Sequence, residues 1–352
     1  MTKPDLSKID VIAPNFKRRL SGVTSTIVRL VPLQARKIGI VTAAPIMPDD
    51  VPVISPAALI TMSRSGPSGA RVWHARRNLE MIAGLALKHL LRKRLRLMFT
   101  SASQRHHTGL TKWLIRRMER VVATSAKTAA YLERDATVIH HGIDADQFSP
   151  AADRIALRKE LGLPEHAILV GCYGRIRAQK GTDAFVDTLL DLMDRQDNVV
   201  GIVMGRATEK YESFEADLRK RINERGHADR LLFKPEVPVW QMADWYRVLD
   251  LYVAPQRWEG FGLTPLEAMA CGVPVLATRV GAFEELIVEG KTGALIPPDD
   301  IPAMIDAARN ILDERKLAAM GAAAREHVLA NFRLEAEADA LIEIYRDLLS
   351  NG

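Results

Sequence analysis

The stretch "LDLYVAPQRWEGFGLTPLEAMACGVPVLATRV" (249–280) contains the pattern that decides the fold. It begins with an apolar run, 249–255, continues through a Gly-Phe-Gly loop into a helix-like segment, and ends with a second apolar run, 274–280. Apolar runs that alternate with helical segments of about 10–15 residues are typical of parallel strands buried on both faces. The stretch therefore predicts a strand–helix–strand unit of a parallel β-sheet.

Two carboxylates, Glu259 and Glu267, flank the Gly-Phe-Gly loop of this stretch. We expect Thr264 to be the N-cap of the helix, with Pro265 in its first position and Glu267 in its third, so that a capping box explains Glu267. Gly272 suits the left-handed end of the same helix. Glu259 has no such structural explanation. It follows the carboxyl end of a predicted strand, where it is well placed to bind sugar hydroxyls.

The same alternation extends over the whole chain. Further apolar runs of the second half are 167–174, 198–205, 230–237 and 293–297, and those of the first half are 8–14, 37–44, 94–100, 120–125 and 136–142. Residues 45–69 are rich in Pro, Ser and Gly and are not assigned. The pattern predicts an α/β protein of two doubly wound, Rossmann-like domains that face each other across a cleft, with ligands at the carboxyl ends of the strands.

The length of 352 residues exceeds what one core usually supports, which also favours two domains. The turn-rich segment 144–154 is the expected linker. We therefore predict an N-terminal Rossmann-like domain at 1–148 and a C-terminal Rossmann-like domain at 149–330. Residues 331–352 are predicted to form a helix with an apolar face. This face must pack against another part of the protein, and the N-terminal domain is a candidate.

The two halves of the chain carry opposite charge. Residues 1–150 hold 24 Lys or Arg against 10 Asp or Glu, whereas the remainder holds 25 against 33. A basic half favours an anionic partner, which could be a nucleic acid, an anionic membrane face or an anionic substrate. A solvated basic surface without a partner is the alternative.

Several classes of protein are disfavoured by the sequence. There is no apolar run long enough to span a membrane and no apolar leader segment, which leads us to expect a cytoplasmic protein. The two cysteines, Cys172 and Cys271, offer neither a disulfide framework nor a zinc cluster, and we expect buried thiols. The pair Asp144 and Asp146 superficially matches an Asp-x-Asp metal motif but fits a turn at the linker better, so we expect no metal ion.

The segment "GRIRAQKGT" (174–182) is a candidate anion site. It follows the run 167–173 and precedes a helix that we expect to begin near Thr182. Gly174 permits close approach of the backbone, and Arg175 and Lys180 place two cations beside a helix N-terminus, which suits a diphosphate. The segment lacks the Gly-Lys-Ser/Thr ending of a Walker loop. Two surface cations on an ordinary turn are the alternative.

Four segments of the chain resemble the sequence motifs of a known family. "GRIRAQKG", "EGFGLTPLEAMACGVPV", "VGAFEELIVEGKTGALIPPDD" and "HHGIDADQF" are similar to the signatures of the retaining family-four glycosyltransferases of the GT-B fold. The resemblance covers nearly the whole chain and is strongest from about residue 120 onward. It implies that Glu259 contacts hydroxyls of the donor sugar and that Glu267 binds the ribose of the nucleotide. It also implies that Arg175 and Lys180 neutralise the donor diphosphate, and it needs no cofactor beyond the nucleotide sugar.

Further site residues follow from the residues near these motifs. The backbone N–H groups of Gly262, Leu263 and Thr264 are expected to face the donor site. In the N-terminal half, "RRLSGVTSTI" (18–27) stands where the family has a glycine-rich loop, but Ser21 replaces the first glycine, so Gly22 is the firmer assignment for contact with the donor phosphate.

Three histidines are also singled out. His74, in "VWHARRNLEM" (72–81), stands where related enzymes have a histidine near the reacting sugar, so we expect either a catalytic or a structural role. His140 and His141 are expected to be structural residues that join the domains.

Within the family, "TSASQRHHTGLTKWLIRR" and "WHARRNLE" resemble lipopolysaccharide core mannosyltransferases. This resemblance implies transfer of mannose from GDP-mannose to an inner-core Kdo sugar on lipid A, an anionic glycolipid. Peripheral contact with the cytoplasmic face of the inner membrane is then expected. The segment 81–94, with Leu85, Leu87, Leu90 and Leu91 among basic residues, is expected either to lie on the membrane or to pack on the sheet.

Other functions remain open at this stage. A retaining transferase could use a UDP- or ADP-sugar on another glycan, and an epimerase or hydrolase of nucleotide sugars could use the same phosphate site without an acceptor. A nucleic-acid-binding protein is disfavoured, because the basic half lacks interleaved aromatic residues and any recognisable binding motif.

Overall fold

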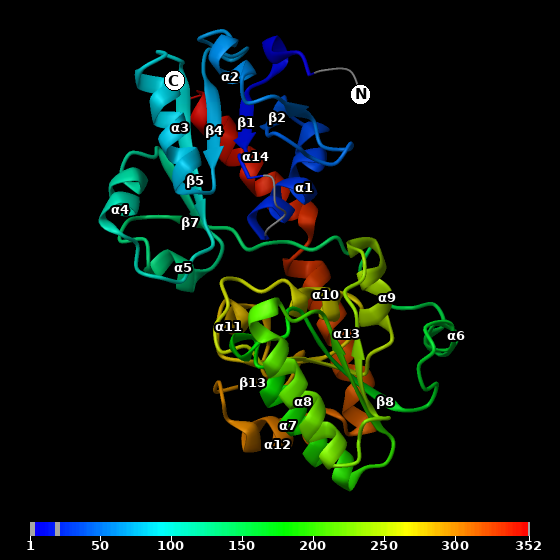
Figure 1. The fold of residues 1–352 in the computed structure, drawn as a ribbon. Helices are drawn as coiled ribbons and strands as arrows, with labels where there is room; N and C mark the ends of the chain where they lie inside the picture. Colours follow the sequence, from blue (N-terminus) through cyan, green and yellow to red (C-terminus); the bar gives the residue numbers. More distant parts are fainter. Residues whose placement is uncertain (1–3, 18–21, 351–352) are drawn as a thin grey trace. The chain divides into compact units, whose positions relative to one another are not determined.

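The computed structural model describes residues 4–17 and 22–350. The chain forms two compact units (Figure 1). The N-terminal unit consists of residues up to Gly142 together with those from Leu334 onward, and the C-terminal unit spans Ile143–Arg333. The sequence predicts these boundaries at 148/149 and 330/331, within a few residues of those observed.

The N-terminal unit is built on a seven-stranded sheet of order β3-β2-β1-β4-β5-β6-β7, in which all pairs are parallel. The strands are β1 (Val11–Pro14), β2 (Ile40–Ala43), β3 (Val53–Ile54), β4 (Arg71–Ala75), β5 (Leu95–Ser101), β6 (Arg120–Ala123) and β7 (Thr137–Val138). The helices are α1 (Gly22–Ala35), α2 (Ala58–Thr61), α3 (Asn78–His89), α4 (Gly109–Ile115), α5 (Ala126–Ala130) and α14 (Leu334–Ser350), with a 3-10 turn at Leu6–Lys8.

The C-terminal unit contains a six-stranded parallel sheet of order β10-β9-β8-β11-β12-β13. The strands are β8 (Ile168–Tyr173), β9 (Val199–Met204), β10 (Leu231–Lys234), β11 (Leu251–Ala254), β12 (Val275–Thr278) and β13 (Gly293–Ile296). The helices are α6 (Arg154–Glu160), α7 (Thr182–Arg195), α8 (Glu212–Glu224), α9 (Met242–Arg247), α10 (Thr264–Ala270), α11 (Phe283–Leu286), α12 (Ile301–Ile311) and α13 (Glu314–Asn331), with 3-10 turns at Ala178–Lys180, Glu209–Tyr211 and Val239–Gln241.

Each sheet is covered by helices on both faces, and each face has its own apolar core. In the N-terminal unit, α3 and α4 pack on one face, and α1 and α14 pack on the other. In the C-terminal unit, α9, α10 and α13 cover one face, and α7, α8 and α12 cover the other. The two doubly wound α/β sheets confirm the predicted fold class.

The C-terminal helix α14 packs within the N-terminal unit, although it is the last element of the chain. Its side chains Leu341, Ile342 and Tyr345 are buried beside α1 and the sheet. Glu337 of α14 binds the chain at the point where it leaves the unit. Its Oε2 accepts a hydrogen bond from the Gly142 N–H at 2.7 Å, and its Oε1 accepts one from Nδ1 of His141, also at 2.7 Å. This buried pair fixes α14 to the segment that ends the unit.

The strand β4 was missed by the sequence analysis, and its polar residues explain why. Arg71 is only 1% exposed, and its guanidinium group donates hydrogen bonds to the carbonyl oxygens of Leu6, Ile9 and Ser63. His74 is also buried. A strand that contains an arginine and a histidine has no clear apolar run, yet β4 lies between β1 and β5 in the middle of the sheet.

The expected capping box at the start of α10 is wrong. The N-cap position is occupied by Leu263, which has helical dihedral angles and makes no side-chain capping bond. Thr264 is therefore the first helical residue, and Pro265 is the second. The start of the helix lies one position earlier than predicted, which moves Glu267 out of the position that a capping box needs and removes that explanation for its carboxylate.

Residues 81–89 of the segment 81–94 belong to α3, which packs on the sheet, as one of the two alternatives expected, whereas Leu90 and Leu91 are exposed. Leu87 is buried and Leu85 is partly buried against the core, so neither of them is available to a membrane. In the part of the chain that the structure describes, no helix combines the length and the apolar character needed to cross a bilayer.

Candidate functional site

The carboxyl edge of the C-terminal sheet contains a topological switch point between β8 and β11. From β8 the chain continues to β9 and β10 on one side, and it returns to β11, β12 and β13 on the other. The loops that follow β8 and β11 therefore leave adjacent strands in opposite directions, and ligands of doubly wound sheets bind at such a point. The two motifs singled out in the sequence, 174–182 and 255–264, are these loops.

Glycines allow the backbones at this edge to approach each other closely. Gly181 has a φ of +71°, and a Cβ atom there would lie 1.8 Å from the carbonyl oxygen of Pro255. Gly205 has a φ of +149°, and a Cβ atom there would lie 1.8 Å from the carbonyl oxygen of Gly174. Any side chain at these positions would force the loops apart, so the glycines keep the loops after β8, β9 and β11 in contact.

An ion pair joins the two loops at their centre. The Lys180 ammonium group donates to Oε2 of Glu259, and Oε1 of Glu259 accepts a hydrogen bond from the Gly260 N–H at 3.0 Å. The two side chains are 24% and 19% exposed. The structure thus brings together the predicted phosphate-binding lysine and the predicted sugar-binding glutamate. Arg175 is exposed and makes no ion pair with any residue in the described ranges.

Arg257 fixes the geometry of this pair, although the sequence analysis did not assign it a role. Its guanidinium group forms two parallel hydrogen bonds with the carboxylate of Asp183, at 2.8 and 2.9 Å, and a third with Asp299 at 2.6 Å. It also donates to the carbonyl oxygen of Ala178. A bidentate arginine–carboxylate pair is directional. It holds the β11 loop, which carries Glu259, against the segment that carries Lys180.

Glu267 is positioned by a tyrosine that the sequence analysis also missed. The Tyr246 hydroxyl donates to Oε2 of Glu267 at 2.7 Å. Burial, with the Glu267 charge as a second cause, raises the pKa of Tyr246 well above its usual range, so the hydroxyl remains a donor. The Tyr246 ring packs against Tyr173 and Tyr252, with centroids 5.1 and 5.4 Å apart. Tyrosines on three separate elements give no contiguous sequence signal.

The remaining donor-site candidates of this unit lie at the start of α10. Gly262 has a φ of +91°, and a Cβ atom there would lie 2.2 Å from the Phe283 ring and 3.1 Å from Cγ of Glu259. Leu263 and Thr264 follow it directly at the beginning of the helix. The backbone at these predicted positions therefore lies beside Glu259.

The other candidates belong to the N-terminal unit. Gly22 is the first residue of α1, whereas Arg18, Arg19 and Ser21 of the expected glycine-loop equivalent lie outside the described residues. His74 has no exposed surface. Its Nδ1 atom lies 2.7 Å from the Tyr345 hydroxyl of α14, and its Nε2 atom lies 2.7 Å from Oγ1 of Thr100.

Burial, followed by the charge of Arg76, holds the pKa of His74 well below its usual range, so the ring is neutral at neutral pH. Both ring nitrogens are occupied, and the contact with Tyr345 holds α14 against β4. This arrangement corresponds to the structural alternative for His74 and does not support contact with a sugar.

The Asp144–Asp146 segment forms a turn, and the two cysteines are buried. Oδ1 of Asp144 accepts hydrogen bonds from the N–H groups of Asp146 and Gln147, at 3.1 and 2.9 Å, as in a capped turn. Within the described residues, no group of three or more His, Cys, Asp and Glu side chains is arranged to hold a metal ion. Cys172 and Cys271 are buried and free, and burial raises the pKa of each thiol to about 12.

Comparison with known proteins identifies the family of this fold and site. Residues 153–327 match the model of the family described as "Glycosyl transferases group 1". The chain is 51% identical to lipopolysaccharide core biosynthesis mannosyltransferase LpsB of Rhizobium meliloti, a match that covers 98% of this chain and 99% of that protein. It is 48% identical to lipopolysaccharide core biosynthesis mannosyltransferase LpcC of Rhizobium leguminosarum bv. viciae, over 99% of both chains.

Solved structures agree with the fold. The Anabaena protein Alr3699/HepE, solved in complex with UDP, superposes with a TM-score of 0.83 at 18% identity, over 96% of this chain and all of that one. The C-terminal domain of the group 1 glycosyl transferase LpcC from Francisella tularensis is 28% identical, with a TM-score of 0.53 over 55% of this chain. The chain belongs to the group 1 glycosyl transferases and is a glycosyltransferase of the GT-B fold.

Proposed function

We propose that this glycosyltransferase moves mannose from GDP-mannose, with retention at the anomeric carbon, onto the Kdo region of a lipid A-linked inner-core acceptor. Two relatives that are each about half identical over the full chain are named lipopolysaccharide core biosynthesis mannosyltransferases, which supports both the sugar and the acceptor class. The observation that carries the proposal is the Lys180–Glu259 pair at the switch point.

The pair suggests how the donor is held. Lys180, aided by the unpaired Arg175, neutralises the diphosphate, and Glu259 accepts hydrogen bonds from hydroxyls of the sugar. Glu267, already oriented by Tyr246, binds the ribose hydroxyls. Backbone N–H groups at Gly262, Leu263 and Thr264, with those at Gly22, add donors for the phosphate oxygens. Lys180 and Glu259 also form an ion pair with each other, which holds both side chains at the switch point.

The proposed reaction is a front-face displacement. The bond between the anomeric carbon and the phosphate oxygen breaks, the acceptor hydroxyl oxygen forms the new bond on the same face, and its proton passes to the departing phosphate. Lys180 and Arg175 stabilise the negative charge that develops on the leaving diphosphate. These cations supply the charge that a divalent metal supplies in other transferases, so we propose that no metal ion or further cofactor takes part.

The charge of the chain supports the proposed acceptor and site of action. The first 150 residues have 14 more Lys and Arg than Asp and Glu residues, as expected for a domain that meets an anionic glycolipid at a membrane surface. We propose a cytoplasmic protein that associates peripherally with the inner membrane and that binds no nucleic acid.

A panel of nucleotide sugars tests the donor. The purified chain is heated with GDP-mannose, UDP-glucose or ADP-glucose, with and without EDTA, because a ligand stabilises the state that it binds. We expect the largest rise in Tm with GDP-mannose, unchanged by EDTA, and mannose transfer to Kdo–lipid A with an α-linked product. A larger rise with a UDP- or ADP-sugar would favour the alternative transferase. Rapid conversion of the donor without acceptor would favour an epimerase or hydrolase.

A further inference from the structure

Helix α3 exposes apolar side chains on the face that points away from the sheet. Its inner face packs Met81 and Leu87 against the core. On the opposite face, Leu79 and Ile82 are 60% and 43% exposed, and Leu90, the C-cap residue that follows the helix, is 79% exposed. The outer face of a helix on a sheet is normally polar. These exposed apolar side chains make the outer face of α3 a candidate docking surface.

Helix α4 extends this apolar surface. It lies beside α3, to which it is joined by a 2.7 Å hydrogen bond from Asn78 to Thr111. Leu110 and Trp113 of α4 are 57% and 47% exposed, and the Arg117 guanidinium group lies 3.5 Å from the centroid of the Trp113 ring. We call the outer faces of α3 and α4, with the turn 90–94 between α3 and β5, the α3–α4 surface.

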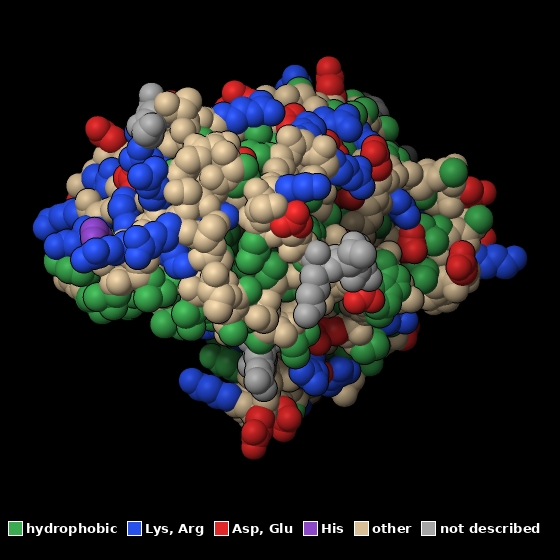
Figure 2. Space-filling view, turned by 90° about the horizontal axis from the view of Figure 1, so that it is seen from above, with side chains coloured by type: hydrophobic (Ala, Val, Ile, Leu, Met, Phe, Trp, Pro, Cys, Tyr) green, Lys and Arg blue, Asp and Glu red, His purple; other side chains and the backbone are tan. Residues whose placement is uncertain are grey.

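The α3–α4 surface is strongly basic. Residues 78–117 include nine Lys or Arg, of which Lys93 is buried, Lys88 and Arg96 pair with Glu119, and Lys112 pairs with Glu133. Arg92 and Arg94 are exposed, and neither forms an ion pair within the described part of the chain. Seen from above, Lys and Arg side chains gather at the left-hand end of the molecule around a histidine, with hydrophobic side chains along the lower edge (Figure 2).

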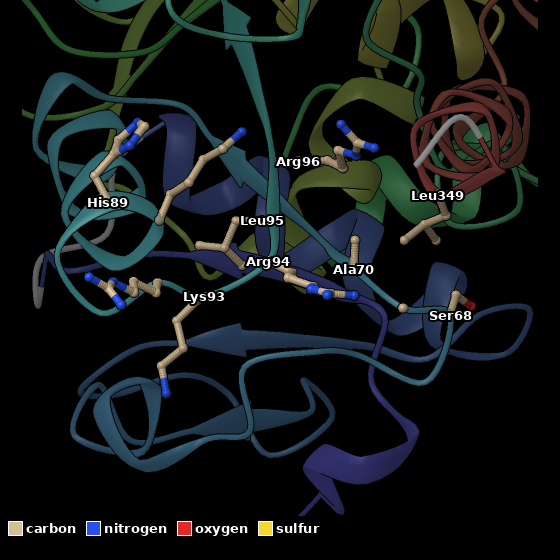
Figure 3. Close-up of a pocket in the computed structure, with 11 residues that line it drawn as sticks. Ser68, Ala70, His89, Lys93, Arg94, Leu95, Arg96 and Leu349 are labelled. Atoms are coloured by element: carbon tan, nitrogen blue, oxygen red, sulfur yellow. The ribbon is translucent and has the colours of Figure 1, made fainter.

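A basic cavity of about 550 Å³ adjoins this surface at the C-terminal end of α3 (Figure 3). The residues that line it include Ser68, His89, Arg92, Arg94 and Arg96. Arg96 is committed to Glu119, at 3.0 Å, whereas Arg92 and Arg94 keep their hydrogen-bond donors available. Such a recess suits a phosphate group, which accepts several charge-assisted hydrogen bonds.

We propose that the α3–α4 surface docks the enzyme on an anionic lipid bilayer. Leu90, Leu91 and Trp113 enter the interfacial layer, and Arg92 and Arg94 bind phosphates of the lipid head groups. Exposed leucines and a tryptophan flanked by arginines are the composition of a surface that lies in a membrane interface. This assignment rests on the proposed function to the extent that the acceptor glycolipid lies in the same bilayer.

A second copy of the chain fits this surface less well. A two-fold symmetric contact would bring the same basic patch of both copies together, including the exposed Arg92 and Arg94 of each copy. Like charges at close range oppose that contact. An anionic bilayer, in contrast, complements both the charge and the exposed apolar side chains.

Sedimentation with lipid vesicles tests the proposal on the full chain, without donor or acceptor. Vesicles of phosphatidylcholine alone are compared with vesicles that also contain phosphatidylglycerol. We expect binding to the anionic vesicles that weakens with salt. The double variants Leu90→Ser with Leu91→Ser, and Arg92→Gln with Arg94→Gln, are each expected to lower the partition coefficient about tenfold or more.

Matched controls come from the C-terminal unit. Ile155 is 47% exposed, and Lys159 and Lys220 are exposed cations. The first control is Ile155→Ser, and the second is the double variant Lys159→Gln with Lys220→Gln. Both are expected to bind vesicles like the unchanged chain. Circular dichroism checks that each variant is folded. Equal binding to both kinds of vesicle, or unaltered binding of the Leu90/Leu91 and Arg92/Arg94 variants, would overturn the proposal. So would a dimer in solution that the Leu90/Leu91 variant dissociates.

A second readout separates this proposal from the proposed function. Turnover is measured with GDP-mannose and an acceptor dissolved in detergent, where docking on a bilayer is not needed. The docking variants are expected to keep this turnover and to lose turnover on acceptor embedded in vesicles. Vesicle binding without any mannose transfer would contradict the proposed function and leave the docking surface in place.

Discussion

At the scale of single residues, the site depends on where backbones touch as much as on charged groups. Lys180 reaches Glu259 because the loops after β8 and β11 are in contact, and Gly181 permits that contact. The sequence predicted Lys180 and Glu259 as separate ligands of the donor. It could not predict their pairing, because that depends on the order of the strands.

The role of Gly181 is tested by comparison with a second glycine. Gly181 and Gly290 have nearly the same φ, +71° and +72°, but a Cβ atom at Gly290 has no neighbour within 4 Å. Gly290→Ala should therefore lower the free energy of unfolding by about 1 kcal/mol, through backbone strain alone. Gly181→Ala should cost on the order of 3 kcal/mol or more, because Pro255 must also move. Urea denaturation measures both, and equal losses would show that the loops do not touch.

At the scale of elements, α14 is held by buried polar contacts as well as by apolar packing. Burial alone would raise the pKa of the Glu337 carboxyl group, but the His141 charge and hydrogen bonds from His141 and Gly142 outweigh it and lower the pKa below its ordinary value of 4.5. A carboxylate with a lowered pKa stabilises the fold at neutral pH. That stabilisation is lost as the pH falls below about 4.5 toward the pKa of the folded state.

Replacing Glu337 tests this contribution through its pH dependence. At pH 7, Glu337→Gln should lower the free energy of unfolding by about 3 kcal/mol, because it removes one partner of a buried pair. The difference from the unchanged chain should shrink as the pH falls below 4.5. Glu343, exposed on the same helix and paired with Arg346, is the control, and Glu343→Gln should cost less than about 1 kcal/mol. A difference that does not vary with pH would contradict the ionic role.

At the same scale, the elements that the sequence analysis misplaced are those with polar interiors. The strand β4 was hidden by Arg71 and His74, whose side chains are satisfied by partners from distant parts of the chain. The start of α10 was placed one residue late because Thr264 and Pro265 match a capping pattern that the structure does not use. Apolar periodicity predicts helices and strands well where their buried side chains are apolar. It fails where the buried side chains are polar and are satisfied by long-range hydrogen bonds.

At the scale of the whole molecule, the two doubly wound units and the family were predictable from the sequence. Apolar runs alternate with helical segments along most of the chain, and several signature motifs of the family occur in it. The residues that orient the site were not. Arg257 reaches Asp183 across two loops, and Tyr246 reaches Glu267 from another helix. No spacing in the sequence indicates either contact. The sequence likewise places Leu90 and Leu91 in a segment that could lie on a membrane, but it does not separate them from Leu85 and Leu87, which pack on the core.

The measurement that tests the central claim most directly is the activity of Glu259→Gln. The account predicts that mannose transfer falls by about two orders of magnitude, since a group that positions the sugar is lost. The affinity for GDP and the Tm should change little, and Glu224→Gln, an exposed carboxylate at the end of α8 in the same unit, should behave like the unchanged chain. Unchanged turnover of Glu259→Gln would contradict the assignment of the Lys180–Glu259 pair as the centre of the donor site.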